Sequence, residues 1–360
     1  MDDAFYAQTS FASEYGWIGM PSLESLSPVL GSPSEDYTML SKAMVDRQNR
    51  ITPISTTANQ VLYNFGAKIA AHLKNSTADS FKRVIHASQV VQSDCLSAES
   101  EHYRRDRDSI HATAGATFWM LDDNWPVESW TSLEYGGRPK LLHYSAMKFS
   151  SQVAVSTVCL PSIGNCAAVS VHVSSEKLAA VTGTLSIKVV RWADGKSGAA
   201  STTPLSIKPQ GGATVAADSA KFGAMLKAAG CATTADCFVS ASLKSADAQA
   251  PVSYQWLTMW KDAKLKPAKL SVVSAVAAGS DGAMRVTVVS DAVAPQTMVH
   301  CGQATDFGQF DTNAILLMPG VPVTLLYTPK AQPSIAGTHT PCTRAADFYV
   351  VAANGLSGSE

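Results

Sequence analysis

The chain has 360 residues, a formal net charge of −1, and 16% charged residues, below the roughly 25% of typical domains. This length predicts two to three domains with sizeable cores. The sequence has no basic run, and no stretch approaches the roughly 20 apolar residues of a membrane span, so we expect no nucleic acid, no membrane span and a neutral ligand.

The start of the chain, residues 1–10, is acidic and too polar for a secretory signal peptide. We therefore expect no signal peptide in this chain, which is either a cytosolic protein or one whose true start lies further upstream. Seven cysteines form no Cys-x-x-Cys pair, which argues against zinc and thioredoxin-like sites. Cys231 and Cys237 are six residues apart, and Cys159 and Cys166 seven, so each pair either closes a small disulfide loop or remains two buried thiols.

The first 149 residues alternate between strand and helix patterns. Residues 9–13 predict a short strand with Glu14 at its C-terminal end, and a long connection follows, with helix-like segments at residues 22–29 and 37–46. Residues 60–73 and 80–110 then show helical spacing of apolar side chains, which in the second segment are Phe81, Val84, Ile85, Val91, Cys95 and Tyr103.

A buried strand of about five to seven residues is expected to begin at Ala116, followed by a helix over residues 140–148. Strand, helix, strand, helix is typical of an α/β barrel. A (β/α)₈ barrel needs about 250 residues, so residues 1–149 can form only part of one.

From residue 150 the pattern changes to short β-branched runs separated by Gly, Pro and Ser turns, which predicts β-sandwiches. The helix expected here covers residues 219–229, and a domain boundary falls near residue 265. An aromatic cluster of Tyr254, Trp256 and Trp260 is either a binding platform or a core that joins domains. The expected strands are residues 153–159, 167–173, 182–190, 238–243, 270–276, 284–289, 314–317, 321–327 and 347–352.

The most distinctive stretch runs over residues 116–130, where a strand pattern ends in Trp residues interleaved with acids. Flat apolar faces next to oriented hydrogen-bond acceptors suit a sugar. An ordinary strand with half-buried Trp side chains fits the same stretch equally well. The chain has no Gly-x-Gly-x-x-Gly, Walker or His-Glu-x-x-His motif, and its histidines lack ligand spacing, so we expect neither cofactor nor metal.

Five motifs nevertheless occur in an order and spacing that resembles the β-mannosidases of glycoside hydrolase family 2. They are Ser13-Glu14-Tyr15-Gly16 with Pro21; Tyr103-Arg104-Arg105; Phe118-Trp119-x-Leu-Asp-Asp-x-Trp125; Leu133-Glu134-Tyr135-Gly136-Gly137; and Leu142-His143-Tyr144. The resemblance is to the C-terminal part of these enzymes. It implies a multidomain α/β plus all-β protein: the C-terminal part of a (β/α)₈ barrel (1–149), then two immunoglobulin-like β-sandwich domains (150–264 and 265–360).

The resemblance implies a retaining exo-hydrolase that removes terminal β-D-mannose residues from β-mannoside oligosaccharides. Glu14 is then the nucleophile, and a second Glu, about 5–5.5 Å away in retaining enzymes, donates the proton. In the family that second Glu follows an Asn, and this sequence contains no Asn-Glu dipeptide. The resemblance therefore also implies a truncated chain whose Met1 is internal.

Other residues take implied roles by the same resemblance. Trp119 lies under the mannose ring, Asp123 or Asp122 binds ring hydroxyls, and Trp125 shapes the leaving-group side. Arg104 or Arg105 is implied to hold a carboxylate at the rim of the sugar pocket or behind it. The family usually has Gln and Asn where this chain has Met120 and Asp122, which puts hydroxyl contacts through these two positions in question.

Two further readings stay open. The missing Asn-Glu also fits a non-catalytic carbohydrate-binding remnant, and the same motifs fit another exo-glycosidase of the family, such as a glucosaminidase. The resemblance implies a lysosomal or secreted protein, and the sequence leaves the oligomeric state undefined.

Overall fold

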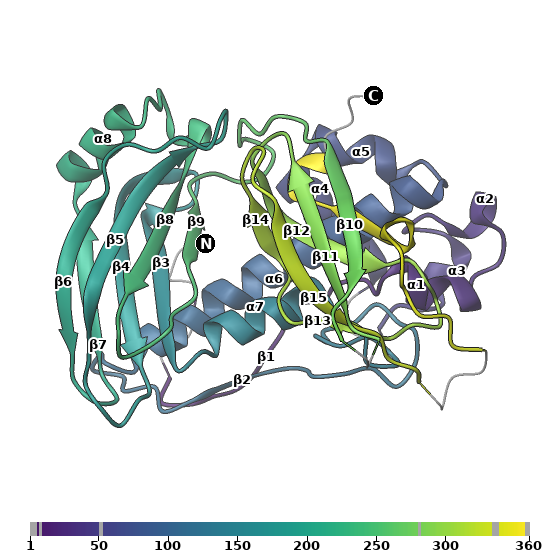
Figure 1. The fold of residues 1–360 in the computed structure, drawn as a ribbon, viewed down its shortest axis with the longest axis horizontal. Helices are drawn as coiled ribbons and strands as arrows, with labels where there is room; N and C mark the ends of the chain where they lie inside the picture. Colours follow the sequence, from purple (N-terminus) through teal and green to yellow (C-terminus); the bar gives the residue numbers. More distant parts are fainter. Residues whose placement is uncertain (1–5, 7–8, 50–52, 280–281, 333–337, 357–360) are drawn as a thin grey trace. The chain divides into compact units, whose positions relative to one another are not determined.

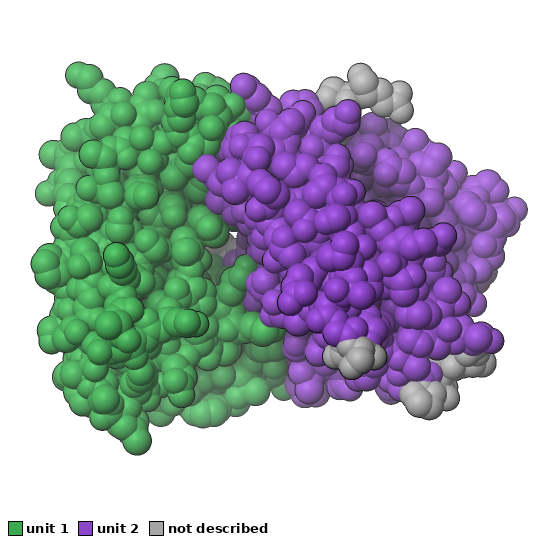
Figure 2. All heavy atoms as spheres, in the orientation of Figure 1, with its two compact units in different colours: residues 1–15, 95–118, 145–265 green, residues 16–94, 119–144, 266–360 purple. Residues whose placement is uncertain are grey.

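The computed structural model describes residues 6, 9–49, 53–279, 282–332 and 338–356. The chain divides into two compact units, which Figure 2 shows in different colours. Unit 1 comprises residues 1–15, 95–118 and 145–265, and unit 2 comprises residues 16–94, 119–144 and 266–360. Unit 2 contains two β-sheets, and unit 1 contains two larger sheets and a short two-stranded one (Figure 1).

A short parallel sheet in unit 1 joins two distant parts of the sequence. Its strands are β1 (Ala12–Tyr15) and β2 (Ala116–Phe118), paired at Ala12 with Ala116 and at Tyr15 with Phe118. Glu14 lies inside β1 rather than just after it. The expected buried strand of five to seven residues is wrong: β2 has three residues and Thr117 is exposed, because the described sheet has only these two strands and leaves β2 largely uncovered.

Short helices precede the long helix that leads toward β2. The helix expected over residues 60–73 is broken at Gly66, whose φ of 61° ends one helix before the next begins. The helices are α1 (Leu23–Leu26), α2 (Pro33–Asp36), α3 (Lys42–Val45), α4 (Ile54–Phe65), α5 (Ala67–Leu73) and α6 (Ala78–Asp106).

Helix α6 confirms the predicted helical spacing, because all six of its expected apolar positions are buried. A further short helix, α7 (Leu141–Phe149), follows the Trp-rich stretch close to the predicted range. Within the described residues, none of the helices is both long and apolar enough to cross a membrane.

The sandwich of unit 1 consists of two antiparallel sheets with the orders β3-β4-β7 and β6-β5-β8-β9 (Figure 1). Buried side chains such as Val155, Val171, Ile187 and Val239 form one core, to which Phe222 of α8 (Ser219–Ala228) is added. The strands are β3 (Val153–Ser162), β4 (Asn165–Ser175), β5 (Val181–Arg191), β6 (Ser201–Ile207), β7 (Gly212–Ala217), β8 (Cys237–Lys244) and β9 (Ser253–Trp256).

The sandwich of unit 2 has sheets of order β10-β11-β15-β13 and β14-β12-β16. Strand β11 alternates between buried and more exposed residues, as expected for a strand with one face on a core. Tyr327 of β15 packs against Phe348 of β16 with ring centroids 5.1 Å apart. The strands are β10 (Leu270–Ala277), β11 (Met284–Ser290), β12 (Ala294–Cys301), β13 (Gln309–Phe310), β14 (Ile315–Leu317), β15 (Val323–Thr328) and β16 (Phe348–Val351).

Disulfides hold both sandwiches. The structure pairs Cys159 with Cys166 and Cys231 with Cys237, the two short spacings in the sequence. A third disulfide joins Cys301 to Cys342 across 41 residues, which the sequence spacing did not suggest. The aromatic cluster named from the sequence lies in unit 1, where Trp256 packs against Trp192 and Trp260 with ring centroids 5.6 and 5.1 Å apart.

Candidate active site

Glu14 is exposed on β1, and its neighbour Tyr15 is turned into unit 1. The Tyr15 hydroxyl lies 2.8 Å from Ser100 Oγ on α6, and its ring meets the ring of Tyr103 edge-on. The pairing of β1 with β2 is irregular between Ala12 and Tyr15, and Ser13 and Glu14 are both exposed there. The strand therefore presents Glu14 to solvent within the described structure.

Each of the two arginines on α6 lies near a carboxylate, and Arg104 lines the same cavity as Tyr15. Arg104 Nη2 lies 3.3 Å from Glu176, and its other nitrogens donate to Ser174 Oγ at 3.2 Å and to backbone carbonyls. Arg105 Nη1 lies 3.9 Å from Glu101. Burial lowers the pKa of Arg104, while Glu176 acts in the opposite direction. Arg104 thus holds a carboxylate of the sandwich domain of unit 1.

A cavity of about 270 Å³ separates this part of α6 from β2 in unit 1. Its walls include Tyr15, Ser100, Tyr103, Arg104 and Phe118. The volume approaches the lower end of small-molecule sites, roughly 300 Å³. The Arg104 guanidinium contacts Glu176, Ser174 and backbone carbonyls, and among the described residues its Nη2 has no hydrogen-bond partner.

In unit 2, residues 119–133 form a closed loop that carries exposed indoles. Trp119 is 46% exposed and Trp125 42% exposed, and the Trp119–Met120 peptide bond is cis. The chain after β1 approaches this loop closely: a Cβ on Gly16 would lie 2.6 Å from the Trp119 carbonyl oxygen. Position 16 therefore requires glycine, which gives a physical reason for the Gly of the Glu14-Tyr15-Gly16 motif.

The two neighbouring aspartates of the loop differ in environment. Asp122 is exposed, whereas the side chain of Asp123 is only 3% exposed. Asp123 Oδ2 accepts hydrogen bonds from Ser129 Oγ at 2.7 Å and Thr131 Oγ1 at 2.6 Å. Burial raises the pKa of the Asp123 carboxyl, and Lys140 and these hydroxyls oppose that shift. Asp122 is accessible to a ligand, and Asp123 is turned into the protein.

Two buried charged residues belong to the same region and were not assigned roles from the sequence. Glu128 is fully buried and accepts a hydrogen bond from Thr57 Oγ1, and burial raises its pKa to about 7. Lys140 is also fully buried, with its Nζ 3.0 Å from the Gly19 carbonyl oxygen. A residue pattern does not show which side of a loop faces inward, so the sequence did not identify Glu128 as a buried carboxyl.

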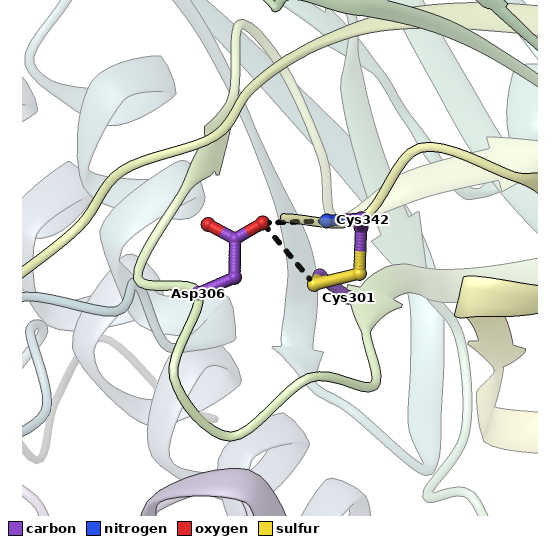
Figure 3. A group of neighbouring side chains, drawn as sticks. All are labelled: Cys301, Asp306 and Cys342. Atoms are coloured by element: carbon purple, nitrogen blue, oxygen red, sulfur yellow. Dashed lines mark hydrogen bonds between the residues drawn. A yellow bond between two sulfur atoms is a disulfide. The ribbon is translucent and has the colours of Figure 1, made fainter. Parts of the chain in front are cut away.

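Among the described residues, the side chains close enough together to hold a metal ion are Cys301, Asp306 and Cys342 (Figure 3). The two sulfur atoms are bonded to each other, so neither is a thiolate able to bind a metal. Asp306 is buried, and its Oδ2 accepts a hydrogen bond from the Cys342 backbone N–H at 2.9 Å. This group is therefore a structural disulfide with a buried carboxylate beside it.

Comparisons with known proteins identify similar domains and relatives. Residues 167–262 match the family model of a Mannosidase Ig/CBM-like domain, and residues 265–341 match that of an Ig-fold domain of mannosidases, which confirms the predicted Ig-like domains. A β-mannosidase from Bos taurus is 37% identical over 150 residues, covering 40% of this chain and 16% of the relative. A β-mannosidase A from Aspergillus clavatus is 28% identical over 226 residues, covering 59% of this chain and 23% of the relative.

Solved structures show the same fold over nearly the whole chain. A β-D-mannosidase from Dictyoglomus thermophilum aligns with a TM-score of 0.70 at 14% identity, covering 95% of this chain and 37% of that one. The exo-chitosanase CsxA from Amycolatopsis orientalis aligns with a TM-score of 0.66 at 17% identity, covering 98% of this chain and 44% of the chitosanase. The chain thus spans less than half the length of these proteins. Together, the matches confirm the resemblance to the C-terminal portion of the β-mannosidases of glycoside hydrolase family 2.

Proposed function

We propose that this chain carries the nucleophile and one wall of the sugar pocket of a retaining exo-β-mannosidase. In this proposal residues 1–149 supply the C-terminal part of a (β/α)₈ barrel, and residues 150–264 and 265–360 form the two immunoglobulin-like domains. Strand β1 precedes α6 in the sequence and β2 follows it, and the two strands pair in parallel. This supports the barrel assignment, because parallel strands joined by a helix are the repeating unit of a (β/α)₈ barrel.

The observation that carries the proposal is the pairing of Tyr15 with Phe118. Glu14 directly precedes Tyr15, and Trp119 directly follows Phe118, so each key residue lies next to the last paired position of its strand. Both side chains are exposed. A carboxylate and an accessible indole at the ends of neighbouring parallel strands suit a pyranose, because barrel sites form at the carboxyl ends of strands.

In the proposed reaction, the Glu14 carboxylate attacks C1 of the terminal mannosyl unit. The bond from C1 to the leaving oxygen breaks, and a second carboxylic acid protonates that oxygen. The same second group then removes a proton from water, which attacks C1 and releases mannose and free Glu14. This sequence has no Asn-Glu pair to supply the second group, so we assign it to the part of the relatives that the chain does not match.

We assign the remaining contacts by accessibility. Trp119 is the surface for the apolar face of the sugar ring, Trp125 borders the leaving group, and Asp122 is the hydroxyl ligand because it is exposed. Asp123 is not assigned a hydroxyl contact, because its carboxylate is turned inward and already accepts two hydrogen bonds. Three disulfides favour a lysosomal or secreted protein, since oxidising compartments preserve them.

Covalent trapping tests the nucleophile on this chain without the proton donor. A 2-deoxy-2-fluoro-β-mannoside with a dinitrophenolate leaving group needs no general acid, so we expect Glu14 to form a glycosyl ester that peptide mass spectrometry detects. Glu14→Gln should form none. Glu35→Gln, a matched change at an exposed glutamate of α2, should label like the wild type. An adduct on another residue, or equal labelling of the Glu14→Gln variant, would rule out Glu14.

A second candidate is a non-catalytic carbohydrate-binding protein, favoured by the missing Asn-Glu pair. It predicts binding of a non-hydrolysable thio-β-mannoside with no adduct on any residue. An exo-glycosidase of different specificity predicts trapping by a reagent of another sugar configuration instead. The same labelling experiment, run with reagents of manno and gluco configuration, separates the three candidates.

A further inference from the structure

The loop over residues 119–133 is closed at its base by backbone hydrogen bonds within unit 2. Met120 N donates to the Trp130 carbonyl at 3.4 Å, and Leu133 N donates to the Leu121 carbonyl at 2.8 Å. The exposed indoles Trp119 and Trp125 lie at the start and in the first half of this loop. Their orientation therefore depends on what holds the chain between them.

Asp123 holds that part of the loop from the inside. It lies between the two indoles in sequence, and its Oδ2 accepts hydrogen bonds from Ser129 and Thr131 in the returning half of the loop, at 2.7 and 2.6 Å. Both hydroxyls come from buried residues. The carboxylate thus crosslinks the two halves of the loop beneath the exposed side chains.

Lys140 lies under this crosslink and completes it. Its Nζ is 4.0 Å from Asp123 Oδ2 and donates to the Gly19 carbonyl at 3.0 Å and to Ser129 Oγ at 3.4 Å. Its side chain has no exposed surface. An ammonium group buried in this way is costly unless a carboxylate and hydrogen bonds compensate it, so Lys140 and Asp123 depend on each other.

We propose that Lys140 and Asp123 are positioning residues that hold Trp119 and Trp125 in the arrangement that receives a glycoside. This inference deepens the proposed function and rests on it for the identity of the ligand. Through its hydrogen bond to the Gly19 carbonyl, Lys140 also fixes the loop to the segment that follows β1. Burial lowers the pKa of Lys140, and the Asp123 carboxylate is the strongest of the groups that oppose this shift.

The test uses the whole chain labelled with 5-fluorotryptophan, whose seven indoles give seven ¹⁹F signals. The loop carries three indoles, so Trp→Phe variants at positions 119, 125 and 130 assign their signals. In Lys140→Met and Asp123→Asn we expect the signals of Trp119 and Trp125 to move and those of Trp192, Trp256 and Trp260 in unit 1 to stay. Affinity for p-nitrophenyl 1-thio-β-D-mannopyranoside should fall by about tenfold, or about 1.4 kcal/mol.

Two further variants complete the test. Lys42→Met makes the same change at an exposed lysine paired with Asp46, and should leave both measurements unchanged. Thr131→Val removes one hydroxyl from Asp123 at nearly constant shape, so it tests the crosslink even if the charge variants do not fold. We expect it to move the same two signals.

Opposite outcomes are distinguishable. If the wild-type chain binds the thio-mannoside and the folded variants bind equally well with unmoved ¹⁹F signals, the positioning role is wrong. If the wild type does not bind, the proposed ligand is wrong, and the ¹⁹F signals alone decide whether Lys140 and Asp123 hold the indoles. Movement of all seven signals would show a general loss of structure and would also overturn the positioning role.

Discussion

Replacing Glu128 by Gln should change how the stability of unit 2 depends on pH. Burial raises the pKa of Glu128 from 4.5 to about 7, because its carboxyl has no exposed surface. Thr57 donates to Oε1, and among the described residues Oε2 has no hydrogen-bond partner. The folded state therefore favours the protonated, uncharged carboxyl.

The sign of the effect follows from the direction of this shift. A carboxyl whose pKa is higher in the folded state stabilises the fold fully below pH 4.5 and loses that contribution as the pH rises through about 7. The interval from 4.5 to about 7, at about 1.36 kcal/mol per pH unit, corresponds to about 3.4 kcal/mol. The Gln side chain does not titrate and lacks this loss.

We expect the free energy of unfolding of Glu128→Gln, minus that of wild type, to be about 3 kcal/mol larger at pH 8 than at pH 4, so the variant gains relative stability at high pH. Calorimetry at both pH values, with urea unfolding as a second measurement, gives this difference independently of any constant packing effect of the amide. Glu35→Gln is the control at an exposed site and should show little change. A difference below about 1 kcal/mol, or one of opposite sign, would refute a buried, uncharged Glu128.

Two other changes test the packing of unit 2. Replacing Cys301 and Cys342 together by Ala opens a 41-residue loop and should cost about 4 kcal/mol of stability in non-reducing buffer; urea unfolding that matches the wild type would contradict the disulfide. Burial, and secondarily His300, lowers the pKa of His86 from 6.5 to about 3. A neutral buried imidazole stabilises the fold above pH 6.5, and this contribution is lost as the pH falls toward 3. When the pH is lowered from 6.5 to 4.5, the free energy of unfolding of His86→Leu should therefore fall by about 2.7 kcal/mol less than that of the wild type. Equal acid sensitivity of the two proteins would contradict this.

Local patterns predicted much of the fold. The apolar spacing of α6 identified its buried face, and β-branched runs located most of the longer strands. Burial of one face imposes a helical period on apolar residues in a helix and a period of two in a strand. The sequence missed β6, β7, β9, β12 and β13; β12 contains Pro295 and polar residues, and β7 consists mainly of small residues. These strands form because neighbouring strands pair with them, which a local pattern does not show.

The candidate site was predictable in its residue types but not in its geometry. The motifs singled out Glu14 and the Trp-rich stretch, yet they treated Asp122 and Asp123 as equivalent. Hydrogen bonds from Ser129 and Thr131 turn Asp123 inward, and these contacts depend on closure of the whole loop. Lys140 was expected to begin an ordinary helix, because a sequence pattern does not reveal that a charge is buried against a distant carbonyl.

The most direct measurement of the central claim is the rate of covalent trapping at Glu14 by 2-deoxy-2-fluoro reagents of manno and gluco configuration. The proposed function predicts a single adduct, on the peptide that contains Glu14, formed with the manno reagent and at least about tenfold more slowly with the gluco reagent, a difference of about 1.4 kcal/mol in activation free energy. No adduct on Glu14 from the manno reagent, in a chain that binds the thio-mannoside, would contradict a nucleophilic role for this residue.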